Sequence, residues 1–142
     1  MNLEEQLRAE RECTRLCNDF AWSVDQCDYD AFVRLFADDG VFERGGQASE
    51  GSAAIRSFLD GRPQGRVTRH LCANIRIDMT SAETAVGTCS ALMFQAPAES
   101  SATPSQPLPV STPVVVDYVD DYVLTHVGWK FKKRRTMLVF QP

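Results

Sequence analysis

The residue best suited to acid–base chemistry is His70, one of two histidines in the 142-residue chain. It lies in a segment, about residues 67–78, whose alternation of polar and apolar side chains predicts a long β-strand. Because strand side chains alternate between faces, Thr68, His70, Cys72 and Asn74 should share one face. An imidazole titrates near neutral pH and suits general acid or base catalysis. We expect His70 to point into a pocket; the alternative is a partly buried histidine without a catalytic role.

The opposite face of this predicted strand is apolar, with Leu71, Ala73, Ile75 and Ile77. An exposed face of this kind would be adhesive, so a second subunit is expected to cover it. This predicts a homodimer through the outer face of the sheet. A β-bulge in the strand would break the alternation and reverse the two assignments.

Asp25 is the predicted partner of His70. A first helix is expected to begin at Asn2, which forms a capping-box pattern with Glu5, and to run to about Gln26. Asp25 then falls in its last turn, where the helix dipole disfavours a carboxylate. A carboxylate on one ring nitrogen would fix the tautomer of His70 and raise its basicity. The alternative is a half-solvated surface aspartate.

Tyr118, Asp120 and Tyr122 alternate onto one face of another predicted strand. A tyrosine hydroxyl there could donate a hydrogen bond to a substrate oxygen. The alternative is that the two aromatic rings pack in the core and that Asp120 is solvated.

The elements that would position these residues are three helices followed by a mostly antiparallel sheet, an α+β plan. The sheet must bury one face against the helices and is expected to curl into a cone with one open mouth. Residues 96–113 hold five of the seven prolines and are predicted to form a long hairpin loop, either a lid or a mobile segment. The predicted helices are 2–26, 28–40 and 52–59, and the predicted strands are 41–44, 67–78, 83–95, 114–125 and 129–140.

Composition limits the classes of function. The length fits one domain, residues 1–142, and the net charge of −4 argues against nucleic-acid binding. The basic cluster 130–135 is interpreted as a solvated strand face. No apolar run is long enough to span a membrane. Five cysteines without a Cys-x-x-Cys pair predict reduced thiols in a cytoplasmic protein, with no metal. No phosphate-binding loop or hydrolase motif occurs, so no cofactor is expected.

Five motifs in a characteristic order resemble the SnoaL-like group of the nuclear transport factor 2 superfamily, which includes scytalone dehydratase, ketosteroid isomerase and dioxygenase β subunits. The likeness covers nearly the whole chain and implies a cone-shaped α+β barrel. The motifs are Asp25-x-x-Asp28-Tyr29-Asp30-x-Phe32, Leu35-Phe36-Ala37-Asp38-Asp39-Gly40-x-Phe42, Gly51-x-x-x-Ile55, Thr68-Arg69-His70-x-x-x-Asn74, and Gly128-Trp129-Lys130-Phe131 with Arg135.

The resemblance implies an aspartate–histidine pair, which falls on Asp25 and His70. Such a pair removes a proton while hydroxide or alkoxide leaves. The chain departs from scytalone dehydratase where that enzyme has tyrosines, here Val24 and Arg44, so scytalone is not the expected substrate. Tyr118 or Arg44 could take over their polarising role. The remaining side chains expected to contact substrate are Asn74, Trp22 and Phe94.

The expected function is therefore a cofactor-free lyase or isomerase, dehydratase- or cyclase-like, acting on a small cyclic or polyketide-like molecule. Two alternatives stay open. The pocket could hold a ligand without reaction, or the chain could be an accessory subunit of a ring-hydroxylating oxygenase.

Overall fold

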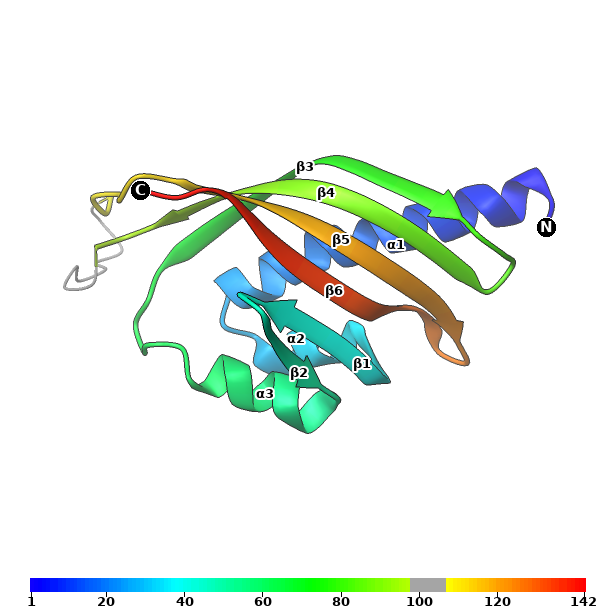
Figure 1. The fold of residues 1–142 in the computed structure, drawn as a ribbon, viewed down its shortest axis with the longest axis horizontal. Coiled ribbons are helices and arrows are strands. Elements are labelled where there is room, and N and C mark those ends of the chain that lie inside the picture. The colour runs from blue at the N-terminus through cyan, green and yellow to red at the C-terminus, as the bar shows by residue number, and fades with distance from the viewer. Residues whose placement is uncertain (98–106) are drawn as a thin grey trace.

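The computed structural model describes residues 1–97 and 107–142, which form three helices and a six-stranded sheet (Figure 1). Helix α1 spans Leu3–Asp25 and begins with the expected capping box of Asn2 and Glu5. Helix α2, Tyr29–Arg34, is capped by the side chain of Asp28, and helix α3 spans Ser52–Asp60. The strands are β1 (Phe36–Arg44), β2 (Gln47–Glu50), β3 (Thr68–Met79), β4 (Thr84–Gln95), β5 (Val114–Thr125) and β6 (Gly128–Phe140).

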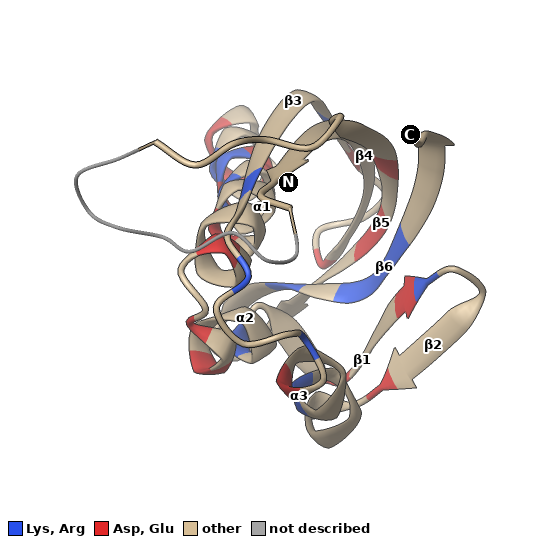
Figure 2. Ribbon diagram, turned by 90° about the vertical axis from the view of Figure 1, so that its left-hand side faces the viewer, with Lys and Arg blue, Asp and Glu red and all other residues tan. Residues whose placement is uncertain are grey.

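The sheet has the strand order β2-β1-β6-β5-β4-β3. Only the β1–β6 pair is parallel among the strand pairs of the described residues. Strands β3 to β6 curve strongly around α1, and the β1–β2 hairpin with α2 and α3 lies across the opening (Figure 2). The sheet stays unclosed, with β2 and β3 at its edges. The expected α+β plan, helices packed on a curved and mostly antiparallel sheet, is confirmed.

The core fills the concave side of the sheet. Helix α1 buries one stripe there because its apolar residues recur at helical spacing, including Leu16, Phe20 and Val24. The ring of Phe20 packs at 4.6 Å from Phe32 and at 5.3 Å from Tyr118, measured between centroids. The first helix, the second helix and β5 are therefore joined by aromatic contacts.

A β-bulge interrupts β3 and changes which residues face inward. Between Ala73 and Arg76 the pairing with β4 gains one residue on β3, and Asn74 adopts a positive φ of 54°. Thr68, His70 and Cys72 face inward before the bulge, as predicted. After it, Ile75 and Ile77 pack against the core although an uninterrupted alternation places them outside. Asn74 itself is exposed, so the prediction that it lines the pocket is wrong.

A second bulge lies in β6. Tyr122 of β5 pairs with Phe131 of β6, and the residue before it, Asp121, pairs with Lys133. Lys132 is therefore an extra residue on β6. The inserted residue turns Arg134 to the same side as Phe131. Arg134 is fully buried, and the interpretation of residues 130–135 as a solvated face is wrong at this position.

Two further boundaries differ from expectation. The second helix ends near Leu35 rather than at Gly40, because Gly40 lies inside β1, where a Cβ would meet the carbonyl oxygen of Ala37 at 2.8 Å. The pair Gly45-Gly46, with positive φ at both residues, turns the chain into β2, a strand that the sequence analysis did not anticipate.

The long connection between β4 and β5 lies only partly within the described residues. Residues 96–97 and 107–113 form neither helix nor strand, and the middle of the predicted loop, residues 98–106, lies outside the described part of the chain. Within the described part of the chain, no helix is long and apolar enough to cross a membrane.

Candidate active site

The described residues line a cavity of about 510 Å³ between the helices and the concave side of the sheet, and the cavity is open to solvent on one side. This volume falls within the range of roughly 300–1,000 Å³ that is usual for small-molecule sites. The wall is mainly apolar and aromatic, while polar groups reach it from several elements. The aromatic part of the wall consists of Phe20, Phe32, Phe42, Phe58 and Tyr118, and the polar groups are those of Arg44, Gln47, Arg62, Arg66, His70 and Thr136.

His70 and Asp25 meet at one edge of this cavity. The last turn of α1 brings Asp25 against the first residues of β3, and the distance from His70 Nδ1 to Asp25 Oδ1 is 2.6 Å. The backbone N–H of His70 donates to Asp25 Oδ2 at 2.7 Å, and the Thr68 hydroxyl donates to Oδ1 at 2.9 Å. Both side chains are largely buried, at 11% exposed for His70 and 6% for Asp25.

These bonds set the charge state of the carboxylate. Burial on its own would raise the pKa of Asp25, but the hydrogen bonds from His70 and Thr68 and the nearby imidazole outweigh it, so the pKa lies below its usual value. An ionised carboxylate can only accept hydrogen bonds, so Nδ1 of His70 must carry the proton. In the neutral ring Nε2 then has a free lone pair. Because His70 lines the cavity, this nitrogen is placed to accept a proton from a bound molecule.

Thr68 is the residue that completes the set of donors around Asp25. Replacing Thr68 by valine removes one hydrogen bond to a buried charge, so we expect a loss of about 1.5–3 kcal/mol in unfolding free energy. It should also raise the pKa of Asp25 towards its ordinary value. The stability that Asp25 contributes is present above the pKa of the unfolded state and is lost as the pH falls through the lower folded-state pKa. In Thr68→Val this loss should begin at higher pH.

Urea unfolding from about pH 3 to pH 7 measures both effects, because this window spans the titration of aspartate. Thr68→Ser keeps the hydroxyl and is the matched control, which should stay close to the wild type. Equal unfolding free energies for Thr68→Val and the wild type at all pH values would contradict the assignment.

Tyr118 and Arg44 both line the cavity, and their contact with a substrate stays a prediction. Burial raises the pKa of Tyr118, so its hydroxyl stays protonated and able to donate. The guanidinium of Arg44 lies 5.9 Å from the centroid of the Phe58 ring, at the exposed rim.

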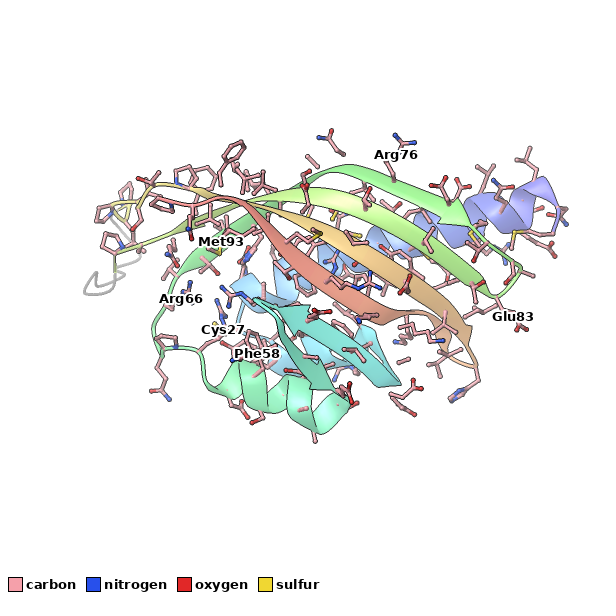
Figure 3. All side chains as sticks on the ribbon, viewed as in Figure 1. Cys27, Phe58, Arg66, Arg76, Glu83 and Met93 are labelled. Atoms are coloured by element: carbon pink, nitrogen blue, oxygen red, sulfur yellow. The ribbon has the colours of Figure 1, made fainter. Side chains whose placement is uncertain are left out.

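Trp22 and Phe94 do not take the predicted positions. Trp22 lies on the outer side of α1 and is 68% exposed, because the stripe that faces the sheet passes through Phe20 and Val24 instead. Phe94 is the cross-strand partner of Arg69, on the outer face of β4, whereas its neighbour Met93 pairs with His70 and lines the cavity. Figure 3 places Met93 on the same side of the sheet as Phe58 and Arg66. The side chain of β4 that reaches the cavity is therefore Met93, one residue before the predicted Phe94.

Arg134 is a second charged centre beside the cavity that the sequence analysis missed. Its Nε and Nη2 donate to the two oxygens of Asp120 at 2.8 and 2.9 Å. The guanidinium lies 4.0 Å from the ring centroid of Tyr118 and 4.4 Å from those of Phe20 and Phe131. Asp120 is therefore buried and paired rather than solvated. A buried positive charge lies directly beneath the tyrosine ring.

Three potential ligand atoms, from Cys17, Cys89 and Asp120, lie within 4.8 Å of one another. The guanidinium of Arg134 already donates to all three side chains, at 3.3 Å to each sulfur. Its positive charge supplies what a cation would supply there, so we assign no metal to this cluster. That the activity needs no metal or cofactor stays a prediction.

The family follows from a comparison with known sequences. The model of the SnoaL-like domain matches residues 5–135, and the chain therefore belongs to the SnoaL-like domain family. Among curated proteins, none matches the sequence significantly.

Solved structures share the fold across nearly the whole chain. LinA has a TM-score of 0.85 at 20% identity, with 99% of this chain and 92% of that chain covered. A variant of Rv3472, a Mycobacterium tuberculosis protein described as of unknown function, has a TM-score of 0.83 at 19% identity, with 99% of this chain and 78% of that chain covered. A protein of Novosphingobium aromaticivorans assigned as a scytalone dehydratase has a TM-score of 0.78 at 21% identity, with 98% of this chain and 89% of that chain covered. At these identities the likeness establishes the fold, which another relative's description names as NTF2-like and cystatin-like.

Proposed function

We propose that the chain is a cofactor-independent lyase or isomerase, dehydratase- or cyclase-like, that acts on a small cyclic or polyketide-like molecule. The observation that carries the proposal is the 2.6 Å bond between Asp25 and His70 at the wall of an apolar cavity. The family supports this class of reaction. Similar structures include a protein assigned as a scytalone dehydratase and LinA, which is described as a hexachlorocyclohexane dehydrochlorinase.

In the proposed reaction, His70 Nε2 takes a proton from a substrate carbon. The electron pair of that C–H bond forms a carbon–carbon double bond, and the bond to the leaving group on the adjacent carbon breaks. The leaving oxygen takes the proton back from the imidazolium and departs as water, which restores the neutral ring. Asp25 stabilises the transient imidazolium and holds the ring in place. Tyr118 donates to the oxygen on which negative charge develops.

A panel of cyclic β-hydroxy ketones tests the proposal, because elimination from them yields a conjugated ketone with a new ultraviolet absorbance. Running the assay in deuterated water also detects reversible proton removal, which would indicate an isomerase. Product formation or deuterium exchange that is lost in His70→Ala is the expected result. A compound that binds in the cavity without either change would instead favour the binding-protein alternative.

We also propose that a second copy of the chain covers the outer face of the sheet. Leu71, Leu92, Val115 and Phe140 are cross-strand neighbours in one row over β3, β4, β5 and β6. Leu71 and Phe140 are 59% and 66% exposed. A continuous apolar row of this kind marks an interaction surface in soluble proteins.

Leu71→Asp should convert this dimer into a monomer, because the aspartate would have to lose its hydration at the interface. Sedimentation equilibrium measures the change, and urea unfolding at low protein concentration checks that the monomer stays folded. Leu7→Asp is the control, because it makes the same replacement at a leucine that is 55% exposed on α1, on the concave side of the sheet and away from the row. A wild-type chain that sediments as a monomer at all concentrations would contradict the proposal.

A further inference from the structure

Three arginines on the cavity wall are not used by the proposed reaction. Arg44 comes from β1, and Arg62 and Arg66 come from the segment that joins α3 to β3, where the ribbon carries basic residues (blue in Figure 2). All three line the same cavity as His70. Figure 3 shows Arg66 between the sheet and α3, on the same side as Phe58 and Met93, whereas Arg76 points away from the outer side of β3.

Within the described part of the chain, the partners of these arginines are neutral. Arg62 donates to the carbonyl oxygen of Val24, the hydroxyl of Tyr29 and the hydroxyl of Thr68. Arg66 donates to the side-chain oxygen of Gln95. Other arginines of the structure do have carboxylate partners; Arg56, for example, pairs with Asp30 and Asp60.

The three guanidinium groups are close enough to repel one another. Burial lowers the pKa of Arg66, and the charges of Arg62 and Arg44 lower it further, because each of these effects disfavours its charged form. The nearest carboxylate in the hydrogen-bond network is Asp25, reached from Arg62 through Thr68. One negative charge against three positive charges leaves this end of the cavity electropositive.

We propose that the molecule bound here is an organic anion, a ring compound bearing a carboxylate, with the carboxylate between Arg44, Arg62 and Arg66 and the ring against the aromatic wall. The inference rests on the proposed function for its reaction and adds the class of substrate. Guanidinium groups bind carboxylates through paired N–H donors, and a desolvated site strengthens such bonds. The carboxylate would fix the orientation of the ring relative to His70.

The three arginines are expected to contribute unequally. Arg66 is half-buried, so its bond to a carboxylate is shielded from water, whereas Arg44 lies at the exposed rim and is screened. Arg62 also holds α1, α2 and β3 together through its neutral partners, so its replacement would disturb the fold. Arg66 and Arg44 are therefore the positions to test.

Calorimetric titration with benzoate and with its neutral analogue benzamide provides the test. The wild type should bind benzoate more tightly than benzamide. Arg66→Gln should weaken benzoate binding by about tenfold or more, as expected for loss of a shielded charge-assisted bond. Arg44→Gln should weaken it by a smaller factor. Neither should change the affinity for benzamide. Arg66→Lys keeps the charge without the paired donors and should fall between the wild type and Arg66→Gln.

Arg76→Gln is the matched control, because Arg76 is exposed on the outer side of β3 and its loss should leave benzoate binding unchanged. Equal affinity for benzoate and benzamide in the wild type, or equal benzoate affinity in Arg66→Gln and Arg76→Gln, would overturn the proposal. His70→Ala separates the two proposals, since it should keep the preference for benzoate while losing the reaction. Loss of the reaction without any anion preference would leave the proposed function standing and refute the anion site alone.

Discussion

Replacing Asp120 by alanine should destabilise the folded chain by about 3–5 kcal/mol, because it leaves the guanidinium of Arg134 buried without a counterion. Both side chains are fully buried and joined by two hydrogen bonds. Burial on its own would lower the pKa of Arg134, but Asp120 raises it well above its ordinary value, so the arginine is charged in the folded state. Urea unfolding at neutral pH measures the loss.

The neighbouring pair of Arg135 and Asp121 is a matched control. It joins the same two strands at 3.3 Å, but both side chains are more than a third exposed. Asp121→Ala should therefore cost less than about 1 kcal/mol. The double variant Asp120→Ala with Arg134→Met should recover part of the loss, because it removes the unpaired charge as well. A loss below about 1 kcal/mol in Asp120→Ala alone would indicate that water or another group reaches Arg134.

Replacing His70 by alanine should lower the turnover of a substrate found in the elimination assay by about 10²–10⁴-fold, the usual contribution of a general base. The fold should survive, since the backbone N–H at position 70 and the Thr68 hydroxyl still donate to Asp25. Asp25→Asn should also reduce turnover, because an amide can donate a hydrogen bond to Nδ1 and so stabilise the wrong tautomer.

His126→Ala is the control for this experiment, because the other histidine lies exposed in the turn between β5 and β6. It should leave turnover unchanged. Near-full turnover in His70→Ala would remove the ring from the mechanism, and the cavity would then have to act through its other polar groups.

The ends of α1 and of the four long strands followed closely from the sequence because local chemistry decides them. The capping box at Asn2 and the cap at Asp28 are determined by residues three positions apart. The Asp25–His70 contact joins residues 45 positions apart. It could be predicted because the resemblance to the family named both positions, whereas neither residue's spacing within its own segment points to the other.

The errors at Ile75, Ile77 and Arg134 originate in the two bulges. A sequence carries no clear mark for an inserted residue in a strand, and every side chain beyond the insertion changes face. For this reason Ile75 was assigned to the outer face and Arg134 to the solvent. Even the positive φ of Asn74 agrees with only a weak preference of asparagine for that conformation. Trp22 and Phe94 were predicted to contact substrate because of their residue type. The residues that line the cavity are instead Phe20 and Val24, two positions from Trp22, and Met93, one position from Phe94.

The bulge at Asn74 also affects how relatives of this chain should be aligned. A homologue with a regular strand in this place has one residue fewer between the segment that carries His70 and the segment that carries Ile75. An alignment without a gap would then match every inward residue of one half with an outward residue of its counterpart. A single-residue gap placed at Asn74 aligns inward residues with inward residues on both sides of the bulge. Comparisons of the residues that face inward from this strand require that gap.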